Sequence, residues 1–143
     1  MRADELVISQ HLQGKKVEYQ IAHPESFIDQ LKWMNAMYIR GGETKKLIEL
    51  LSQSPGWEKE LEGKTVAGGS AGAIALGKYS YDLDNLGLEE GLGLVTVKVL
   101  VHYRSNYNAP NIDWDKAEVE LKNYKEDLPL LKLAEGEFRV IEQ

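Results

Sequence analysis

The residues best suited to chemistry form the run Gly68-Gly69-Ser70-Ala71-Gly72, in which a serine stands between small neighbours. Residues 64–67 before the run predict a short strand, and the small residues after it predict a helix. A serine on such a tight turn is pushed clear of the sheet, and only very small neighbours avoid its strained backbone. The pattern predicts a nucleophile, Ser70, with the amide of Ala71 pointing at a developing oxyanion. The alternative is a glycine-rich turn with an incidental serine.

A second pair of glycines offers another exposed backbone segment. Gly41-Gly42 follows the apolar residues 36–39, which predict a buried strand that stops at the pair. Ligands in open α/β sheets bind at the carboxyl ends of strands. The amide of Gly41 or Gly42 is therefore a candidate for the second oxyanion donor. A plain turn before the helix that begins at Thr44 is the alternative.

A serine nucleophile needs a base, and the sequence contains three histidines, His11, His23 and His102. A base is expected at a strand end, or in the loop after it, on the same sheet edge as the nucleophile. His102 fits best because it follows residues 95–101, whose alternating valines predict a strand. His23 also follows a predicted strand and is the second candidate. A structural or surface role is the alternative for each histidine.

The elements that must position these residues follow from hydrophobic periodicity. Short apolar strands alternate with amphipathic helices in the first half of the chain, which predicts a parallel sheet flanked by helices. Helices are expected over residues 3–12, from Pro24 onward, and over residues 44–53, 71–76 and 113–124. Strands are expected over residues 16–21, 36–39, 64–67, 95–101 and 137–141.

Composition limits the classes of function. A length of 143 residues, 43% of them hydrophobic, suits one domain, and a formal charge of −6 argues against non-specific nucleic-acid binding. No stretch approaches the roughly 18 consecutive apolar residues of a membrane span, and no signal-peptide pattern opens the chain. The lack of cysteine excludes disulfides, thiolate metal sites and a cysteine nucleophile. We therefore expect a cytoplasmic protein whose partners are neither nucleic acid nor a membrane.

Four segments together resemble the peptidase E and cyanophycinase-like group of serine peptidases. Residues 37–44 resemble the family's strand followed by Gly-Gly-Asn-Thr, and residues 65–73 resemble its Gly-x-Ser-Ala-Gly-Ala nucleophile segment. The Gly-Leu-Gly-Leu of residues 91–94, with His102-Tyr103 after it, resembles the stretch that leads to the catalytic histidine. Residues 133–136 resemble a late acidic-Gly turn, and the segments occur in order over residues 17–141.

The resemblance implies an α/β fold, a three-layer αβα arrangement with a mostly parallel sheet of the flavodoxin-like or class I glutamine amidotransferase-like type. It implies hydrolysis of small peptides, dipeptides with an N-terminal Asp among them, without a cofactor or a metal. Ser70 is then the nucleophile and His102 the base. Glu135 is the expected third member of the triad, with Glu137 and Asp127 as alternatives.

Three charged residues near these segments are candidates for substrate binding. Glu43 stands where the family usually has Asn, and its carboxylate could select the amino terminus of a substrate. Arg40 and Arg104 flank the expected cleft, and either could bind a substrate carboxylate through a bidentate pair. Surface charges are the alternative for both arginines.

The acidic run after the nucleophile helix contains Asp82, Asp84, Glu89 and Glu90. It lacks the Asp-x-Asp-x-Asp-Gly pattern with a closing Glu that a calcium loop requires. We therefore predict a solvated loop there rather than a metal site.

The resemblance also suggests how the chain is organised. Residues 1–143 would form a single peptidase E-like domain that lacks the usual first strand–helix–strand unit. Loss of that unit would expose sheet edges and apolar faces, so we expect a homo-oligomer that covers this edge. The competing hypothesis is a catalytically silent peptidase E-like module for binding or assembly.

Overall fold

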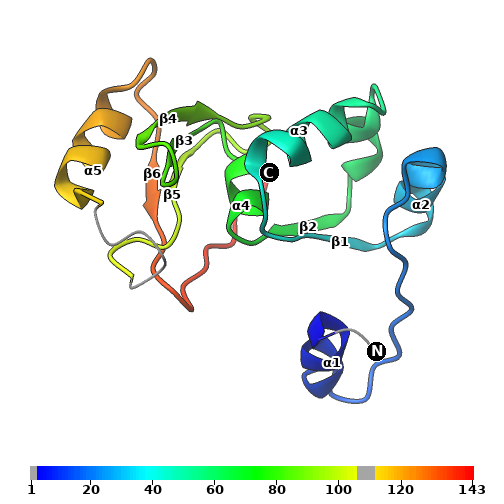
Figure 1. Ribbon diagram of the computed structural model, residues 1–143. Coiled ribbons are helices and arrows are strands. Elements are labelled where there is room, and N and C mark those ends of the chain that lie inside the picture. Colours follow the sequence, from blue (N-terminus) through cyan, green and yellow to red (C-terminus); the bar gives the residue numbers. More distant parts are fainter. Residues whose placement is uncertain (1–2, 106–111) are drawn as a thin grey trace.

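The computed structural model describes residues 3–105 and 112–143, and Figure 1 follows the chain through it. The helices are α1 (Ala3–Gln10), α2 (Phe27–Trp33), α3 (Thr44–Ser52), α4 (Ala71–Leu76) and α5 (Trp114–Asn123), with short 3-10 turns η1 (Pro24–Ser26) and η2 (Trp57–Leu61). The strands are β1 (Ala36–Ile39), β2 (Thr65–Gly68), β3 (Tyr79–Asp82), β4 (Gly87–Glu90), β5 (Lys98–Leu100) and β6 (Leu130–Lys132).

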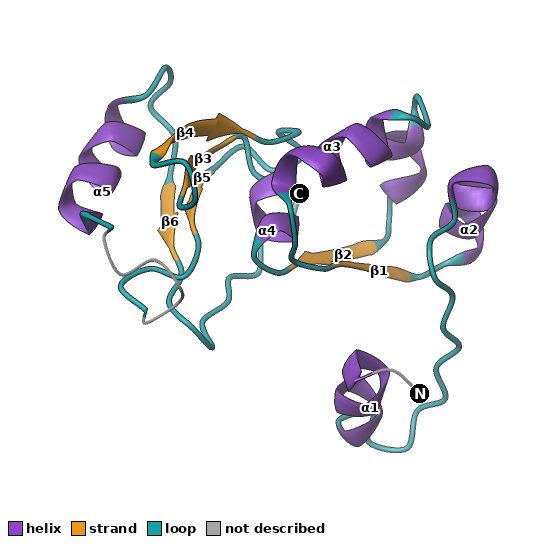
Figure 2. Cartoon of the chain, viewed as in Figure 1, coloured by secondary structure: helices purple, strands orange, loops and turns teal. Residues whose placement is uncertain are grey.

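The strands form two sheets in which parallel pairing prevails. In the first, β1 and β2 pair in parallel, from Ala36 opposite Thr65 to Ile39 opposite Gly68. The second has the order β4-β3-β5-β6, in which only the β3–β4 hairpin is antiparallel. Helix α4 contacts strands of both sheets and lies between them (Figure 2). The predicted mixed α/β class with mostly parallel strands is confirmed, although the strands divide into two sheets.

Most predicted helices and central strands occur where the periodicity placed them. Helix α5 begins as expected after Asp113, whose carboxylate accepts a hydrogen bond of 3.0 Å from the Lys116 amide. Two predictions are wrong, because residues 16–21 and 137–141 belong to no strand. An alternating pattern becomes a strand only where a neighbouring edge supplies backbone hydrogen bonds, and neither segment has such an edge beside it.

The acidic run also differs from the prediction. Residues 79–90 form the β3–β4 hairpin rather than a solvated loop, with Tyr79 opposite Glu90 and Asp82 opposite Gly87. The strand predicted over residues 95–101 is confined to β5, and β6 was not predicted. Strand β6 has the sequence Leu-Leu-Lys, in which polar and apolar residues do not alternate. Hydrophobic periodicity therefore does not predict a strand there.

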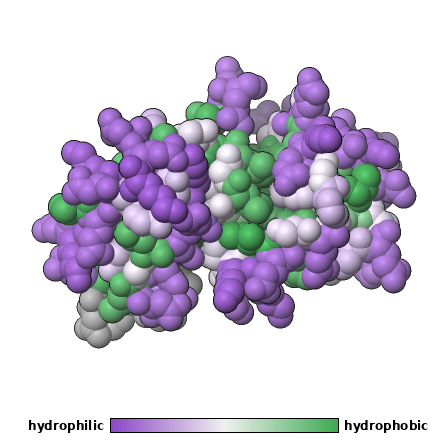
Figure 3. All heavy atoms as spheres, turned by 90° about the horizontal axis from the view of Figure 1, so that it is seen from above, coloured by the Kyte–Doolittle hydropathy of each residue, from purple (hydrophilic) through white to green (hydrophobic). Residues whose placement is uncertain are grey.

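Three groups of buried side chains fill the interior. The group that matters most for the site joins α4 to the segment around β5 and consists of Ile74, Val97, Val99 and Val101. Full burial of each such side chain contributes about 1.5–3 kcal/mol. This packing fixes the start of α4 relative to the residue after Val101. Figure 3 shows that apolar side chains also reach the surface in the middle of one face, between hydrophilic flanks.

Candidate active site

Ser70 occupies the turn between β2 and α4 and has a backbone that serine rarely adopts. Its φ of 53° and ψ of −117° place it in a sparsely populated region, which costs about 1–3 kcal/mol. Hydrogen bonds hold the turn on both sides: the Gly69 amide donates to the Ile39 carbonyl (3.0 Å), and the Ile74 amide donates to the Ser70 carbonyl (3.0 Å). The strain is therefore maintained by the strand before the serine and the helix after it.

Glycines allow this turn because other backbone segments pass very close to it. A Cβ on Gly72 would lie 2.1 Å from the Ile39 carbonyl oxygen, and one on Gly68 would lie 2.5 Å from the carbonyl carbon of Gly72. A Cβ on Gly41 would lie 3.1 Å from the Cβ of Ser70, so the two glycine-containing turns meet. The structure thus brings the Gly41-Gly42 segment beside the serine, at the carboxyl ends of β1 and β2.

His102 lies two residues beyond the end of β5, and its ring faces the serine. The Ser70 Oγ and the His102 Nε2 are 2.9 Å apart, a hydrogen-bonding distance. His102 itself has a positive φ of 54°, and the Tyr103 amide next to it donates to the Leu133 carbonyl (3.0 Å). Its side chain is only 13% exposed. The base is therefore held by the backbone of its own loop and by the segment after β6.

Glu135 contacts the other nitrogen of the same ring. Its Oε1 is bonded to the His102 Nδ1, and its side chain is 62% exposed. Glu137 has a different partner, since its carboxylate accepts a hydrogen bond of 3.0 Å from the Ala134 amide and closes the turn that carries Glu135. Gly136, at a φ of 81°, completes that turn.

The hydrogen bonds define the chemistry that this arrangement can perform. With Nε2 accepting the Ser70 hydroxyl proton, Nδ1 carries the ring proton and donates it to Glu135. A serine, an imidazole and a carboxylate linked in this order are suited to nucleophilic attack on a carbonyl. The Ala71 amide is the first of α4, where amides have no acceptor within the helix, and it lies next to the nucleophile.

A small cleft of about 50 Å³ opens at the Ser70 hydroxyl. Its walls come from the start of α3, the start of α4, the β3–β4 hairpin and the end of the β5 segment; they are formed by Gly42, Thr44, Ser70, Ala71, Ile74, Asp82, Leu83, Asp84, Glu89, Val101 and His102. The volume is well below the roughly 300–1,000 Å³ of a pocket for a drug-sized ligand. It suits one small group at the reacting centre.

Comparison with known protein families assigns the chain. Residues 3–143 match peptidase family S51. The chain belongs to this family. Membership of family S51 supports a hydrolase of peptide bonds and a fold of the flavodoxin-like, class I glutamine amidotransferase-like type. No curated protein and no solved structure matches the chain.

The cleft has an acidic wall, and the sequence analysis did not place its carboxylates beside Ser70. Asp82 and Glu89 lie on paired strands, and with Asp84 they face the same cleft as the nucleophile. Burial, together with repulsion from Asp82 and Asp84, raises the pKa of Glu89 to about 7. Burial opposes ionisation of Asp82 too, but hydrogen bonds from the Asn85 side chain and from the Asn85 and Asp84 amides lower its pKa. The signal available in the sequence was the run Asp82-Leu83-Asp84-Asn85, because Asp and Asn side chains favour turns, and the turn at residues 83–86 is closed by hydrogen bonds to the Asp82 carboxylate.

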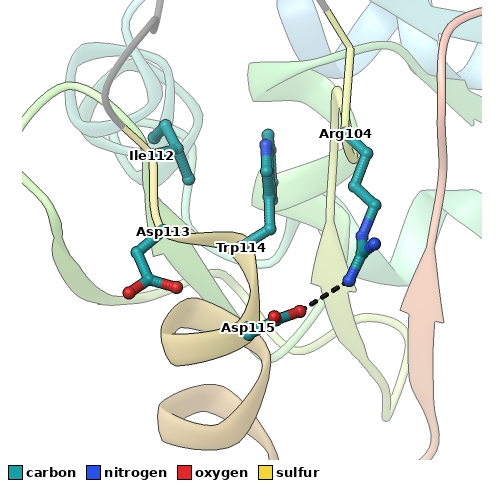
Figure 4. A pocket seen from close by; sticks show the side chains of 5 residues that line it. All are labelled: Arg104, Ile112, Asp113, Trp114 and Asp115. Atoms are coloured by element: carbon teal, nitrogen blue, oxygen red, sulfur yellow. Dashed lines mark hydrogen bonds and ion pairs between the residues drawn. The ribbon is translucent and has the colours of Figure 1, made fainter.

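The three charged candidates for substrate binding lie outside the walls of this cleft. Arg40 is exposed at the end of β1, and Glu43 is exposed at the residue before α3. Arg104 turns to a second pocket, shown in Figure 4, where its guanidinium pairs with Asp115 at 2.6 Å and lies over the Tyr103 ring. Any substrate contact from Arg40 or Glu43 would therefore come from the rim of the cleft.

The other two histidines, His11 and His23, form hydrogen bonds away from the cleft. The His11 Nδ1 is 2.8 Å from the Val7 carbonyl beside α1, and the His23 amide donates to Gln30. In residues 3–105 and 112–143, no three His, Asp or Glu side chains are grouped so that they could hold a metal ion. Over the same residues, every helix is too short or too polar to cross a bilayer.

Proposed function

We propose that this member of family S51 is a serine peptidase that hydrolyses short peptides through Ser70, His102 and Glu135. The observation that carries the proposal is the 2.9 Å hydrogen bond between the Ser70 Oγ and the His102 Nε2, with Ser70 on a strained strand-to-helix turn. A strained backbone of this kind is typical of functional sites and is not expected for a serine without a role. The imidazole beside Ser70 is also bonded to a carboxylate through its other nitrogen, which is the order of groups in a catalytic triad.

The reaction follows from the order of these groups. The Ser70 Oγ attacks the peptide carbonyl carbon while the His102 Nε2 takes its proton. When the tetrahedral intermediate collapses, Nε2 returns that proton to the leaving amine, and an acyl-enzyme remains on Ser70. Water then attacks the acyl carbon by the same route and releases the acid. Glu135 keeps the imidazole in the required tautomer and stabilises the imidazolium that forms.

Backbone amides would stabilise the negative charge that develops on the carbonyl oxygen. The Ala71 amide is one donor, and the amide of Gly41 or Gly42 is the second, because this segment lies against the Ser70 side chain. Loss of one donor of this kind typically costs about 2.7–4 kcal/mol of transition-state stabilisation. Gly41 and Gly42 would therefore contribute a backbone hydrogen-bond donor in addition to the space that their lack of a side chain leaves.

The enclosed part of the cleft has room for one small group at the reacting centre, and short peptides are the substrates that the family resemblance favours. The family resemblance favours dipeptides that begin with Asp. The carboxylates of Asp82, Asp84 and Glu89 oppose an acidic side chain, although Glu89 is largely uncharged below pH 7. We therefore expect the preference for Asp over Asn at the start of the dipeptide to be greater under mildly acidic than under mildly basic conditions.

The test combines peptide hydrolysis with labelling by a fluorophosphonate, a reagent that reacts with activated serines. Three proteins are compared: the wild type, Ser70→Ala, and Ser52→Ala as a control on the exposed surface of α3. We expect the wild type and Ser52→Ala to be labelled at Ser70 and to cleave the dipeptides. Ser70→Ala should lose labelling and about 10⁴-fold or more of the rate.

Two outcomes would contradict the proposal. Ser70→Ala could retain hydrolysis at the rate of Ser52→Ala, which would place the reaction elsewhere. Alternatively, a correctly folded wild type could show neither labelling nor hydrolysis across the dipeptide panel, which would exclude an active serine at this turn.

A further inference from the structure

Tyr103, the residue after His102, lies in a strained loop. His102 and Arg104 on either side of it have φ values of 54° and 52°. Residues other than glycine keep this left-handed backbone only where the surrounding structure holds it. Part of the support is a backbone hydrogen bond of 3.0 Å from the Tyr103 amide to the Leu133 carbonyl. This bond places the loop beside the segment after β6, which carries Glu135.

The Tyr103 side chain contacts α5 rather than the cleft. Its ring lies edge-on to Trp114 at the start of α5, with 5.4 Å between the ring centroids. Its hydroxyl donates to the Glu118 Oε2 (2.8 Å) and accepts from the Arg104 Nε (3.0 Å). The Arg104 guanidinium also lies over the ring, 5.3 Å from its centroid. Both the ring and the hydroxyl of Tyr103 are therefore fixed, although Tyr103 does not line the cleft.

Glu118 connects the Tyr103 hydroxyl to strand β6. The second carboxylate oxygen of Glu118 accepts a hydrogen bond of 2.9 Å from the Lys132 Nζ, which lies 5.4 Å from the centroid of the Tyr103 ring. The hydrogen bonds from Lys132 and Tyr103 lower the pKa of Glu118, so its carboxylate stays charged and accepts from both. Lys132 ends β6, three residues before Glu135. The amide and the side chain of Tyr103 therefore both join the His102 loop to the segment that carries Glu135.

The bond between His102 and Glu135 depends on how these two segments lie. The Glu135 side chain is 62% exposed, so its carboxylate is held mainly by the position of the backbone that carries it. A shift of β6 relative to the loop of residues 102–104 would move the carboxylate away from the His102 Nδ1. A misplacement of about 1 Å in a catalytic site can cost roughly 100-fold in rate.

We propose that Tyr103 is a positioning residue, whose hydroxyl holds the segment that carries Glu135 against His102. Its effect on rate rests on the proposed peptidase reaction, but its effect on the imidazole does not. With Nδ1 bonded to the carboxylate, the neutral ring carries its proton on Nδ1 and accepts from Ser70 at Nε2. When the carboxylate moves away, the proton is no longer held on Nδ1, and a ring with its proton on Nε2 cannot accept from Ser70.

The first test determines which nitrogen of His102 carries the proton. The chemical shifts of the imidazole nitrogens are measured by NMR at about pH 9, where an ordinary imidazole is neutral. The His102 signals are identified by their loss in His102→Gln. We expect the proton on Nδ1 in the wild type. In Tyr103→Phe, which keeps the ring and loses the hydroxyl, we expect the proton to shift toward Nε2.

Tyr79→Phe is the matched control. The Tyr79 hydroxyl also donates to a carboxylate, that of Glu126 (2.7 Å), and this carboxylate also pairs with a lysine, Lys78. The Tyr79 ring likewise lies edge-on to an aromatic neighbour, Tyr124. This network joins the start of β3 to the loop after α5, so its loss should leave the His102 tautomer and the rate unchanged. Circular dichroism checks that each variant is folded.

The second test measures dipeptide hydrolysis. Because Tyr103 does not line the cleft, we expect Tyr103→Phe to lower kcat about 5- to 20-fold and to leave KM within about twofold. Glu118→Gln, which removes the charge that attracts Lys132, should lower kcat in the same way. In Tyr103→Phe/Glu135→Ala the loss should be no greater than in Glu135→Ala alone, because the hydroxyl acts through that carboxylate.

Three results would overturn the proposal. The proton could lie on Nε2 in the wild type, in which case Glu135 does not hold the ring. Tyr103→Phe could match Tyr79→Phe in its tautomer or in its kcat. The losses of Tyr103→Phe and Glu135→Ala could multiply in the double variant, which would mean that Tyr103 acts independently of Glu135. If the wild type cleaves no dipeptide, the peptidase proposal fails, and the tautomer alone decides the role of Tyr103.

Discussion

The two sides of His102 are built very differently. Toward Ser70, the contact lies where β2, α4 and the Gly41-Gly42 turn converge, and the ring itself is 13% exposed. Toward Glu135, the contact reaches a carboxylate that is 62% exposed, on a turn that precedes the exposed residues 136–143. One side is fixed by the backbone and by packing, whereas the other depends on a hydrogen bond at the surface.

The difference has a physical consequence for catalysis. The position of Ser70 cannot change unless β2 or α4 moves, because the glycines leave no free space around the turn. The position of Glu135 depends on a short turn closed by the Ala134–Glu137 hydrogen bond, and water screens its charge. We therefore expect substitutions on the Ser70 side to have large effects and substitutions on the Glu135 side to have moderate ones.

The largest effect is expected for Gly72→Ala. The added Cβ would lie 2.1 Å from the Ile39 carbonyl oxygen, so α4 or β1 must shift. We expect a loss of about 3 kcal/mol in the free energy of unfolding. We also expect a loss of about 100-fold in kcat/KM, because the shift displaces the nucleophile from the base by up to roughly 1 Å. Chemical denaturation and dipeptide hydrolysis measure the two effects.

Gly87→Ala is the matched control for this variant. Gly87 begins β4, its φ is not positive, and a Cβ there would meet no atom within 4 Å. Its stability and rate should remain close to those of the wild type. Equal losses of stability and of kcat/KM in Gly72→Ala and Gly87→Ala would show that the sensitivity of Gly72 is not specific to the Ser70 turn. That result would contradict the proposed difference between the two sides of His102.

A moderate effect is expected for Glu135→Gln. The amide keeps an acceptor for the His102 Nδ1 proton but loses the charge that stabilises the imidazolium. We expect kcat/KM to fall about 10- to 100-fold, which is less than the roughly 10⁴-fold typical of a buried triad carboxylate. Thermal unfolding should be nearly unchanged, since an exposed ion pair contributes about 0–1 kcal/mol.

Glu137→Gln provides the comparison on the same turn. Its amide oxygen can still accept from the Ala134 amide, so the rate should stay within about twofold of the wild type. A loss near 10⁴-fold for Glu135→Gln would mean that this side of His102 is as constrained as the Ser70 side. No loss would mean that Glu135 takes no part in the reaction.

The same contrast explains which parts could be predicted from the sequence. The turn around Ser70 depends on small residues that are adjacent in the chain, so a local pattern was sufficient to predict both the turn and the helix after it. Residues 16–21 show that local information has a limit: their alternation is typical of a strand, but pairing needs an edge that the sequence does not specify. The β3–β4 hairpin was missed because its carboxylates favoured a solvated loop, whereas burial beside the cleft is a tertiary effect.

The smallest effect concerns the acidic wall, which faces the cleft from a third direction. Glu89 has a pKa of about 7, so it is largely neutral at pH 6 and mostly charged at pH 8. An anionic substrate side chain should therefore be disfavoured as the pH rises. We expect the ratio of kcat/KM for Asp-Leu to that for Asn-Leu to fall about two- to fivefold between pH 6 and pH 8, as one screened charge allows.

The ratio removes the ionisation of His102 from the comparison, because both peptides are cleaved by the same groups. In Glu89→Gln the ratio should no longer change over this range, since Asp82, whose pKa is lowered, stays charged throughout. Glu90→Gln is the control: Glu90 is the next residue on β4, pairs with Lys125, and lies outside the walls of the cleft. It should keep the pH dependence of the wild type. A fall in the ratio that persists in Glu89→Gln would show that the titrating group lies elsewhere, and that the acidic wall does not control the choice of substrate.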